Sequence, residues 1–480
     1  MDRSLAELLD ALPTEISGPA RARAEESLQN LVRDLEQKAV PAGRLRRAWI
    51  FGSVQAKIAA AYFANWIRSG WSEAGEKERR LAETRLKAAL ELLGGMGHLR
   101  GTMMKAGQIF ANYPNVAPEE FAGVLGYFHF EAPPMHFSLL REFVRGELGA
   151  DPEDLFDDFE TKAFAAASLG QVHRARIKGT AERVAVKIQY PGIARTIRDD
   201  LRNLKSLLFP MRLRGDWDNL SAQYDEILAM VERETDYEQE AENLRVARSA
   251  FAPDEGILVP EVYSALSTKR VLTMEYVDGV HLKPFLQSNP TQETRDAYGE
   301  KIWLTSVRLS FAKHMIYADP HPGNYFFRTD GFLGLVDMGC CRYLSDDDVA
   351  YSDAMTRASN GPAEVRRESM RLAVDAKPGQ TVAADQARLI EEYSDWCWEP
   401  IYHEGRFDFG DPRYFQRGVD VIREVMRRGY LRSRPVNNWM QRSFFGIRAM
   451  LCRLGARIDA GSIFRQETAA AAQGSGEGDQ

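Results

Sequence analysis

Hydrophobic residues recur at helical spacing in the first part of the chain and again in the last, whereas a shorter period governs the middle. In residues 44–66 the apolar side chains return every three or four positions, which predicts an amphipathic helix. Between residues 156 and 277, short runs rich in β-branched residues predict strands. From residue 291 onward the spacing is mainly helical, apart from a strand–loop–strand passage at 325–336. The predicted fold class is therefore α+β, with a helical extension preceding a strand-rich lobe and a helix-rich lobe.

The strand-rich part contains one helical stretch. Residues 172–177, 183–190, 256–263 and 270–277 are short and β-branched, and each predicts a strand. Residues 221–250, which lie between the second and third of these, have a strongly helical pattern. We therefore predict one long helix inserted among the strands.

These changes of pattern divide the chain into five parts. We expect an N-terminal arm, a helical extension, a strand-rich lobe, a helix-rich lobe and a tail, over residues 1–40, 41–150, 151–280, 281–465 and 466–480. The tail is low in complexity and is predicted to be disordered. In the helix-rich lobe, residues 432–457 combine arginines with large apolar residues at helical spacing, which predicts an amphipathic helix packed on that lobe.

Composition narrows the class of protein. With 480 residues and 44% hydrophobic residues, the chain can bury a sizeable core. Its net charge of −7 argues against a general nucleic-acid binder. Four cysteines without a C-x-x-C pair indicate reduced thiols. No signal sequence is visible, and no run of about 18 uncharged apolar residues predicts a membrane span. We expect a cytoplasmic protein; the helix at 44–66 is either buried on one face or lies on an anionic membrane.

Lys187 is the first candidate for chemistry. It lies in the alternating apolar strand Val-Ala-Val-Lys, where a lysine must either reach solvent or meet a negative partner. In protein kinases a strand of this kind places its lysine on the phosphates of ATP, and a glutamate of the next helix holds it. The helical stretch that follows offers Glu234, Asp236 and Glu240 as partners. A run of charges on a solvated helix face is the alternative interpretation.

Two further motifs fit phosphoryl transfer. Asp319 and Asn324 are separated by five positions, the spacing of the kinase catalytic loop. Asp337 follows two apolar residues and precedes Met-Gly, as a metal-binding Asp at the end of a strand does. Either motif alone is typical of a turn. Together, and downstream of the lysine strand, they predict a carboxylate for the attacking group and two oxygen ligands for Mg²⁺.

An alanine-rich segment replaces the glycine loop that usually covers the phosphates. Ala165, Ala166, Ala167 and Ser168 precede the lysine strand. Because alanine adopts positive φ less freely than glycine, we expect a stiffer loop, with Ser168 and backbone N–H groups near the phosphates. Without this context a run of alanines favours a helix. Nearby candidates are assigned structural roles: His321 as a loop-stabilising residue, and Cys340 and Cys341 as small buried residues.

Taken in order, these motifs resemble the UbiB family of atypical kinases, also called AarF-domain kinases. The resemblance covers about residues 90–344, with weaker similarity to about residue 463. It adds two motifs to those described above. One is a K-x-G-Q helix, formed by Lys105, Gly107 and Gln108, and the other is an E-x-D motif, formed by Glu234 and Asp236. Met338 stands where kinases have the Phe of D-F-G, and Tyr317 stands before Ala-Asp, but neither departure removes a charged group.

The resemblance implies roles for single residues. Lys187 pairs with Glu240, and Lys105 and Gln108 reach over the active site toward Glu234 and Asp236. The hinge lies near residues 274–277, with Glu275 and Val277 among the nucleotide-binding residues. The fold implied is a bilobal, protein-kinase-like fold with a helical N-terminal extension that covers the usual groove for protein substrates.

The function implied is an ATP- and Mg²⁺-dependent kinase or ATPase that acts on a small or isoprenoid-lipid molecule and supports ubiquinone or related metabolism. Contact with a membrane or a lipid-enzyme complex would be peripheral. Two alternatives remain. One is a non-catalytic, ATP-gated lipid-binding or scaffold module, which the complete set of charged residues disfavours. The other is an ordinary Ser/Thr kinase, which the missing glycine loop disfavours.

Overall fold

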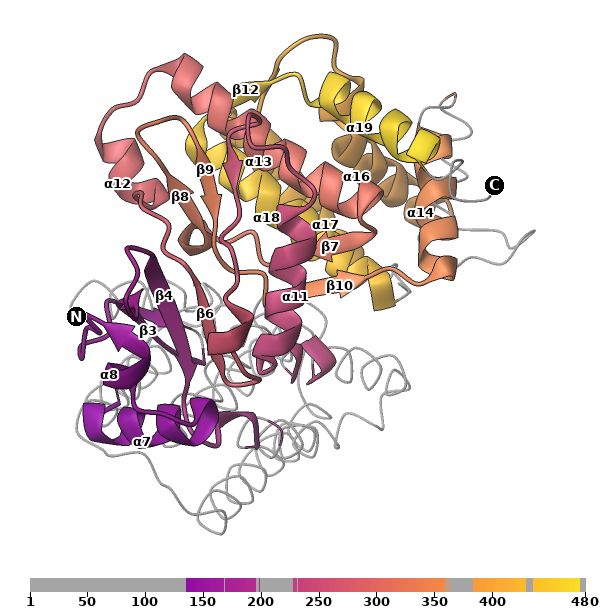
Figure 1. Ribbon diagram of the computed structural model, residues 1–480. Helices are drawn as coiled ribbons and strands as arrows, with labels where there is room; N and C mark the ends of the chain where they lie inside the picture. Colours follow the sequence, from indigo (N-terminus) through magenta and orange to yellow (C-terminus); the bar gives the residue numbers. More distant parts are fainter. Residues whose placement is uncertain are drawn as a thin grey trace, which may run out of the picture. The chain divides into compact units, whose positions relative to one another are not determined.

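The computed structural model describes residues 135–167, 169–195, 198, 228–230, 232–359, 362, 383–428 and 435–474 (Figure 1). The chain forms two compact units, one made of Met1–Met135, Ala166–Gln171 and Gln189–Glu232, the other of His136–Ala165, Val172–Ile188 and Arg233–Gln480. Almost all described residues belong to the second unit. The arm at 1–40 and the helix at 44–66 lie outside the described residues.

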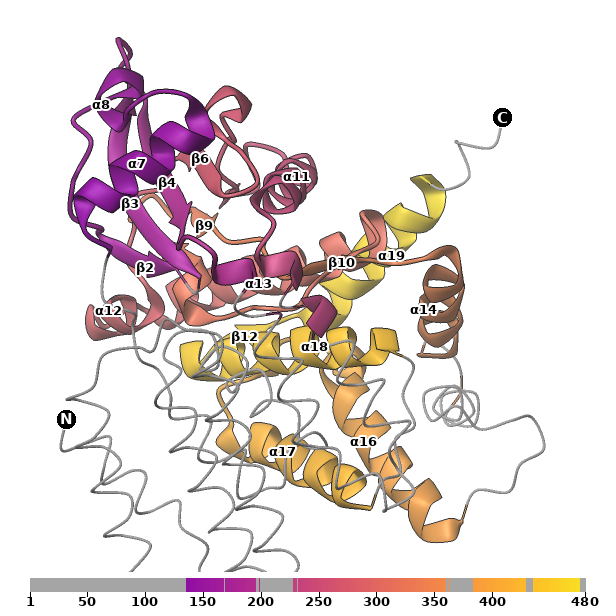
Figure 2. The same ribbon diagram turned by 90° about the horizontal axis from the view of Figure 1, so that it is seen from below.

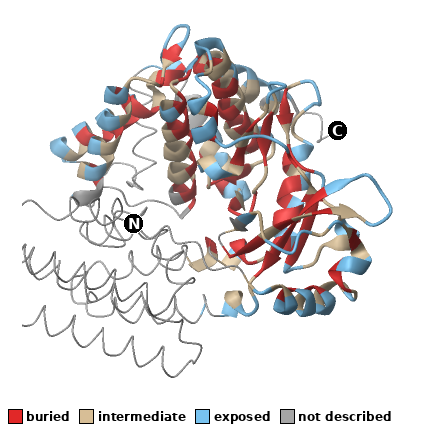
Figure 3. Ribbon diagram, turned by 90° about the vertical axis from the view of Figure 1, so that its left-hand side faces the viewer, coloured by how far each residue is buried: buried red, intermediate tan, exposed pale blue. Residues whose placement is uncertain are grey.

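A five-stranded sheet carries the lysine strand. Its strands are β1 (Phe156–Asp157), β2 (Ala165–Ala167), β3 (Gly170–Ile177), β4 (Arg183–Gln189) and β6 (Val271–Glu275). The order is β1-β3-β4-β6, and β2 pairs with β3. In the antiparallel pair of β4 and β6, Lys187 lies opposite Leu272. Every residue of β4 except Arg183 is buried, so both faces of this strand are covered, including the side that carries Lys187 (Figure 3).

Three helices accompany the sheet: α7 (Phe137–Leu148), α8 (Pro152–Leu155) and α11 (Tyr237–Arg248). Helix α7 is fixed to the β6 region because Glu147 accepts a hydrogen bond from Thr268 at 3.0 Å and pairs with Arg270. Helix α11 packs against β6, and the Tyr237 backbone N–H donates to the Lys269 carbonyl at 3.0 Å. These contacts hold α11 against β6.

The prediction of one continuous helix over residues 221–250 is wrong. The described helical residues of the first segment end at Glu234. A break at Thr235 and Asp236 follows, after which α11 begins. Asp236 caps α11, because its carboxylate accepts the Gln239 backbone N–H at 3.3 Å. An aspartate accepts hydrogen bonds from the first N–H groups of a helix best when it precedes that helix. Because Asp236 takes this position for α11, the first helical segment ends before it.

The prediction of a strand over residues 256–263 holds only in part. Strand β5 (Ile257–Leu258) is short and pairs in parallel with β9 (Leu333–Leu335), in a three-stranded sheet of order β5-β9-β8. Pro260 follows it, and proline cannot donate a hydrogen bond to a strand ladder. The strand–loop–strand passage predicted at 325–336 is confirmed as β8 (Tyr325–Phe327) and β9.

Two small pairs of strands were not predicted from the sequence pattern. Strand β7 (Met315–Tyr317) pairs with β10 (Cys341–Tyr343), and β11 (Phe407–Asp408) pairs with β12 (Arg457–Ile458). Each strand has two or three residues, too few for a period to be visible. The pair β7–β10 matters for function, because the two candidate acidic motifs lie between its strands in the sequence.

Helices make up most of the remaining described residues of the second unit. In chain order they are α12 (Leu282–Gln287), α13 (Gln292–Ala312), α14 (Asp346–Ser359), α16 (Ala384–Tyr402), α17 (Pro412–Arg427), α18 (Pro435–Leu454) and α19 (Ala460–Gly474). Helix α13 packs against α18, α19 and β7, and Ile302 and Trp303 are among its buried residues. Helix α18 lies beside α17 (Figure 2) and buries Trp439 and Leu451, which confirms the predicted amphipathic helix at 432–457.

The prediction that residues 466–480 are disordered is wrong for residues 466–474, which belong to α19. Alanine has the highest helix propensity, so the alanine run extends the helix. Glu467 also forms an ion pair with the half-buried Arg308 of α13, at 2.7 Å. Phe464 is buried. The low complexity of the sequence indicated disorder, but the Glu467–Arg308 ion pair and the buried Phe464 hold this part of α19 against α13 and the core.

The cysteines follow the prediction of reduced thiols. All four cysteines are free thiols, and Cys340, Cys341 and Cys397 are buried. Within the described part of the chain, no helix combines the length and apolar character needed to cross a membrane.

Candidate active site

Lys187 lies between two carboxylates. Its Nζ is 2.7 and 2.8 Å from the two oxygens of Glu240 and 3.0 Å from Oδ2 of Asp337. The side chains of Lys187 and Glu240 are 7% and 1% exposed, whereas that of Asp337 is 32% exposed. The predicted pairing of Lys187 with Glu240 is thus present, and Asp337 is the member of the cluster that faces solvent.

Each of these residues is held by its own element. Lys187 is in the buried strand β4, between Val186 and Ile188. Glu240 lies in the first turn of α11, behind the Asp236 cap. Asp337 follows β9, and its Oδ1 accepts the Gly339 backbone N–H at 3.0 Å.

The turn after Asp337 is fixed on both sides. Asn243 of α11 donates to the Met338 carbonyl at 2.8 Å, and the Met338 side chain is buried in the core. A Cβ at Gly339 would lie 3.3 Å from both Asp337 Oδ1 and Glu240 Oε2. A larger residue would have to displace one of these carboxylates by a few tenths of an ångström, which gives the Gly of D-M-G a physical reason.

Burial and charge set the protonation of the cluster. Although burial opposes charge on Lys187, the charges of Asp337 and Glu240 raise its pKa well above the ordinary value. Burial, and then the charge of Asp337, raises the pKa of Glu240 to about 7. Against burial, Lys187 and the Gly339 N–H lower the pKa of Asp337. Asp337 is therefore the ionised, partly exposed carboxylate of the cluster, available to a cation.

The D-P-H-P-G-N segment forms a compact loop between β7 and β8. Asn324 Nδ2 donates to Tyr317 Oη and to the Asp319 carbonyl, both at 3.0 Å, and lies 3.4 Å from Asp319 Oδ2. His321 Nδ1 accepts the Gly323 backbone N–H at 3.0 Å and caps a single 3₁₀ turn. The interpretation of His321 as a loop-stabilising residue is confirmed.

The two acidic motifs are close to each other. The Val336 backbone N–H donates to the Asn324 carbonyl at 3.1 Å, which joins the loop to the residue before Asp337. The charge of Asp319 raises the pKa of Asp337, partly opposing the effect of Lys187. The second unit thus brings Lys187, Glu240, Asp319, Asn324 and Asp337 into one region.

Arg442 is a member of the site that the sequence pattern missed. Its Nη2 donates to Asp319 Oδ1 at 2.9 Å, and its side chain is 14% exposed. It lies on α18, more than a hundred residues after the acidic loop, among several arginines of the predicted amphipathic helix at 432–457. No spacing rule links a residue to a partner at that separation, so only the tertiary structure identifies it.

The E-x-D residues lie at the break before α11. Glu234 is buried, and its charge acts in the same direction as that of Asp337 to raise the pKa of Glu240. Asp236 caps α11 and pairs with Lys269 at 2.7 Å. The K-x-G-Q residues expected to reach them, Lys105, Gly107 and Gln108, lie outside the described residues, so that role stays a prediction.

The remaining nucleotide-binding candidates are placed as follows. Glu275 ends β6, and its carboxylate accepts a hydrogen bond from Arg248 at 3.2 Å. Val277 is buried against Gly334, where a Cβ would lie only 2.7 Å from Val277 Cγ1. The alanines Ala165, Ala166 and Ala167 form strand β2, not a helix, while Ser168 lies outside the described residues. Their roles toward a nucleotide stay predictions.

The donor set fits Mg²⁺ and phosphates. No group of three or more His, Cys, Asp or Glu side chains within the described ranges could hold a metal ion by itself. Mg²⁺ in nucleotide sites is usually bound by one or two protein oxygens together with substrate phosphates. Asp337 and Asn324 provide such oxygens, and Lys187 provides a charge for phosphate. The residues therefore suit a metal–nucleotide complex better than a metal alone.

Comparisons with known proteins agree with this arrangement. Residues 128–361 match the ABC1 atypical kinase-like domain. A protein of Danio rerio, atypical kinase COQ8B, mitochondrial, is 27% identical over 95% of this chain and 74% of its own length. The chloroplastic protein ACTIVITY OF BC1 COMPLEX KINASE 8 of Arabidopsis thaliana is 30% identical, but the match spans only 40% of its length.

A solved structure shares the fold. The complex of Rv3197 with erythromycin, from Mycobacterium tuberculosis, has a TM-score of 0.54 at 25% identity and covers 81% of this chain and 97% of its own. With the domain match, this likeness bears out the predicted kinase-like α+β fold. The lysine, loop and D-M-G motifs lie close together, and the matched domain and several relatives are described as kinases or atypical kinases. Residues 128–361 therefore form an atypical kinase-like domain, and the named relatives support the resemblance of this chain to the UbiB, or AarF-domain, family of atypical kinases.

Proposed function

We propose that this protein binds ATP with Mg²⁺ and either transfers its terminal phosphoryl group to a small or isoprenoid-lipid molecule or hydrolyses it. One observation carries the proposal: the Lys187 ammonium is held between Glu240 and Asp337, at 2.7 and 3.0 Å. A buried three-charge cluster contributes little to stability compared with apolar packing, so its presence favours a role in binding. An active kinase site requires this lysine–glutamate pair and this aspartate.

Each residue has a distinct task in the proposal. Bound Mg-ATP supplies the phosphoryl group and the positive charge that neutralises it. Lys187 binds phosphate oxygens, and Glu240 keeps its ammonium oriented. Asp337 and Asn324 bind the metal ion. Asp319 accepts the proton of the attacking hydroxyl, while Arg442 keeps the Asp319 carboxylate in place.

The molecule that accepts the phosphoryl group is proposed from the family resemblance and from what a relative binds. The UbiB resemblance favours a small or isoprenoid-lipid acceptor in ubiquinone or related metabolism over a protein substrate. The relative solved with erythromycin shows that a protein of this fold binds a bulky non-peptide molecule. We also propose a cytoplasmic location with peripheral contact to a membrane or lipid-enzyme complex; two relatives are described as mitochondrial and chloroplastic.

Phosphate release from Mg-ATP tests the proposal. We expect the full-length protein to release phosphate when Mg²⁺ is present and to stop when EDTA removes it. Anionic liposomes or phenols that resemble quinone precursors are expected to stimulate release. Asp319→Asn is expected to lower turnover by about 100-fold, because it removes the proton acceptor while preserving side-chain shape.

Two outcomes would overturn parts of the proposal. Turnover in Asp319→Asn equal to that of the wild type would exclude Asp319 as the proton acceptor. Mg-ATP binding without any phosphate release or phosphorylated product over hours would support the alternative, a non-catalytic module gated by ATP.

Arg442 gives a separate prediction. Arg442→Gln is expected to lower kcat by about 10- to 100-fold with little change in KM for Mg-ATP, because a misplaced Asp319 affects the chemical step more than nucleotide binding. Arg442→Lys should recover part of the loss because it keeps the charge. The exposed Arg453 of the same helix provides the matched control, Arg453→Gln, which should behave as wild type. A higher KM with unchanged kcat in Arg442→Gln would contradict the positioning role.

A further inference from the structure

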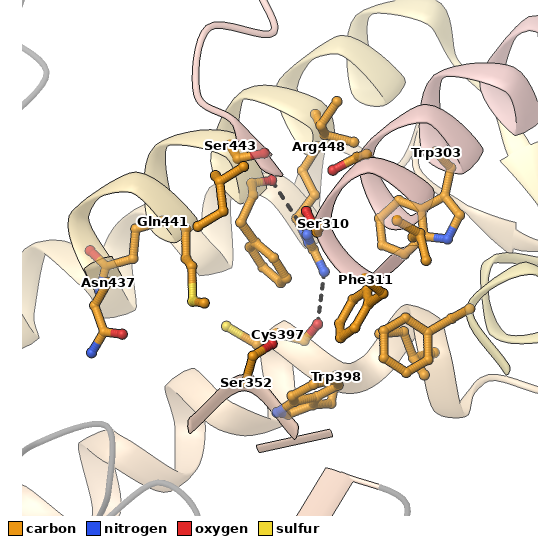
Figure 4. Close-up of a pocket in the computed structure, with 18 of the residues that line it drawn as sticks. Trp303, Ser310, Phe311, Ser352, Cys397, Trp398, Asn437, Gln441, Ser443 and Arg448 are labelled. Carbon is orange, nitrogen blue, oxygen red and sulfur yellow. Dashed lines mark hydrogen bonds between the residues drawn. The ribbon is translucent and has the colours of Figure 1, made fainter. Parts of the chain in front are cut away.

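A second candidate site lies among the helices of the C-terminal half, apart from the residues of the active site. A cavity of about 230 Å³ is lined by α13, α14, α16, α18 and α19 (Figure 4). Its walls are largely aromatic and aliphatic, with Trp303, Phe311, Trp398 and Phe464 among them. A cavity of roughly 150 Å³ can take a benzene ring, so this space suits a body of about ten non-hydrogen atoms.

One charged group lines this apolar cavity. Arg448 of α18 is 1% exposed and belongs to the cavity wall. Its Nε donates to Tyr414 Oη at 2.9 Å, its Nη2 to the Cys397 carbonyl at 2.8 Å, and its Nη1 to the Phe444 carbonyl at 3.3 Å. These three bonds use three of the five guanidinium N–H groups, and every acceptor is neutral.

Within the described part of the chain, no counter-ion balances this charge. Among the described residues, no carboxylate lies within ion-pair distance of Arg448, although most other arginines in this half of the chain have one. Aromatic rings cover the guanidinium instead: its carbon lies 3.0 Å from the Phe444 ring centre and 5.4 Å from that of Trp303. Stacking stabilises a cation, but an isolated buried charge still costs several kcal/mol.

The neighbouring titratable groups cannot supply the missing negative charge. Burial raises the pKa of the Cys397 thiol to about 12, even though Arg448 opposes the shift. Burial likewise raises the pKa of Tyr414, again against the effect of Arg448. Both groups are therefore neutral near neutral pH, so neither of them compensates the charge of Arg448 beside this apolar space.

We propose that this cavity binds a small amphipathic anion: a carboxylate, directed at Arg448, on an apolar body the size of an aromatic ring or a medium alkyl chain. The carboxylate provides the absent counter-ion, and the apolar body fills the aromatic walls. The proposal does not depend on the ATP site, since it uses none of its residues. Free aromatic acids and fatty acids share this chemistry.

Calorimetric titration of the full-length protein, with no nucleotide present, tests the site. Benzoate and octanoate are the two probes, and they separate the aromatic from the alkyl source. Octanol and acetate are the controls, since octanol keeps only the apolar body and acetate only the carboxylate. We expect saturable one-to-one binding of benzoate or octanoate, at least tenfold tighter than that of either control. Octanol that binds as well as octanoate would overturn the assignment of an anion.

Variants locate the binding. Arg448→Met should weaken binding of the better probe by about 10- to 100-fold, the effect of one charge-assisted interaction, whereas Arg453→Met on the exposed face of the same helix should not. Ser310→Phe places a ring into the cavity without removing a bond of Arg448, and it should abolish probe binding with Mg-ATP binding unchanged. Unaltered probe binding in Ser310→Phe would overturn the proposal even if Arg448→Met failed to fold.

Discussion

Replacing Glu240 with alanine is expected to destabilise the protein by about 3 kcal/mol, near the lower end of the range for a broken buried ion pair. The mutation removes two hydrogen bonds from Lys187, at 2.7 and 2.8 Å, and leaves a void where the side chain is 1% exposed. Asp337 remains at 3.0 Å and offsets part of the loss. Equilibrium unfolding in urea measures the change.

The same helix provides a matched control for this experiment. Glu242 is exposed and pairs with Arg245 at 3.0 Å across one turn of α11. Glu242→Ala is expected to change stability by less than about 0.5 kcal/mol, as for other solvent-exposed pairs. Equal effects of the two mutations would mean that the Lys187–Glu240 pair is no more important than a surface pair.

Replacing Asp337 with asparagine is expected to reduce Mg-ATP turnover by at least about 1000-fold, because removing a metal ligand removes several kcal/mol of stabilisation from the transition state. The fold should survive. Lys187 keeps both bonds to Glu240, and the loss of the Asp337 charge relieves one cause of the raised pKa of Glu240. Steady-state phosphate release, together with the urea midpoint, separates loss of activity from loss of structure.

The clearest contradiction would be an Asp337→Asn protein that keeps wild-type turnover. Asp347, in the acidic first turn of α14, serves as the control because its charge lies outside the cluster. Asp347→Asn should keep wild-type activity. Equal losses in the two variants would point to a general effect of negative charge instead of metal binding.

Local motifs in the sequence were sufficient to predict the centre of the site. The Lys187 strand, the Asp319–Asn324 spacing and the Asp337 turn each follow from a few neighbouring residues, and the structure brings them together. The partner of Lys187 was less certain from the pattern. Glu234, Asp236 and Glu240 all lie in the stretch with a helical pattern. Because the helix breaks at Thr235 and Asp236, Glu240 falls in the first turn of α11, within reach of Lys187 on β4.

Features that depend on distant parts of the chain could not be predicted. Arg442 meets Asp319 only because α18 packs against β7 and α13. Arg448 is one arginine among many in the sequence, and only the tertiary structure shows that no carboxylate of the described residues pairs with it. The Arg308–Glu467 ion pair joins α19 to the distant helix α13. A low-complexity sequence gives no sign of such a contact, so the pattern predicted disorder there.

Titration of ATP into the full-length protein, with and without Mg²⁺, tests most directly whether these charged groups form a metal–nucleotide site. We expect Mg²⁺ to tighten ATP binding to the wild type, and we expect this effect to disappear in Asp337→Asn. Lys187→Met should weaken ATP binding whether or not Mg²⁺ is present, because the phosphates lose their cation. ATP affinity that is the same in all three proteins, under both conditions, would contradict the account.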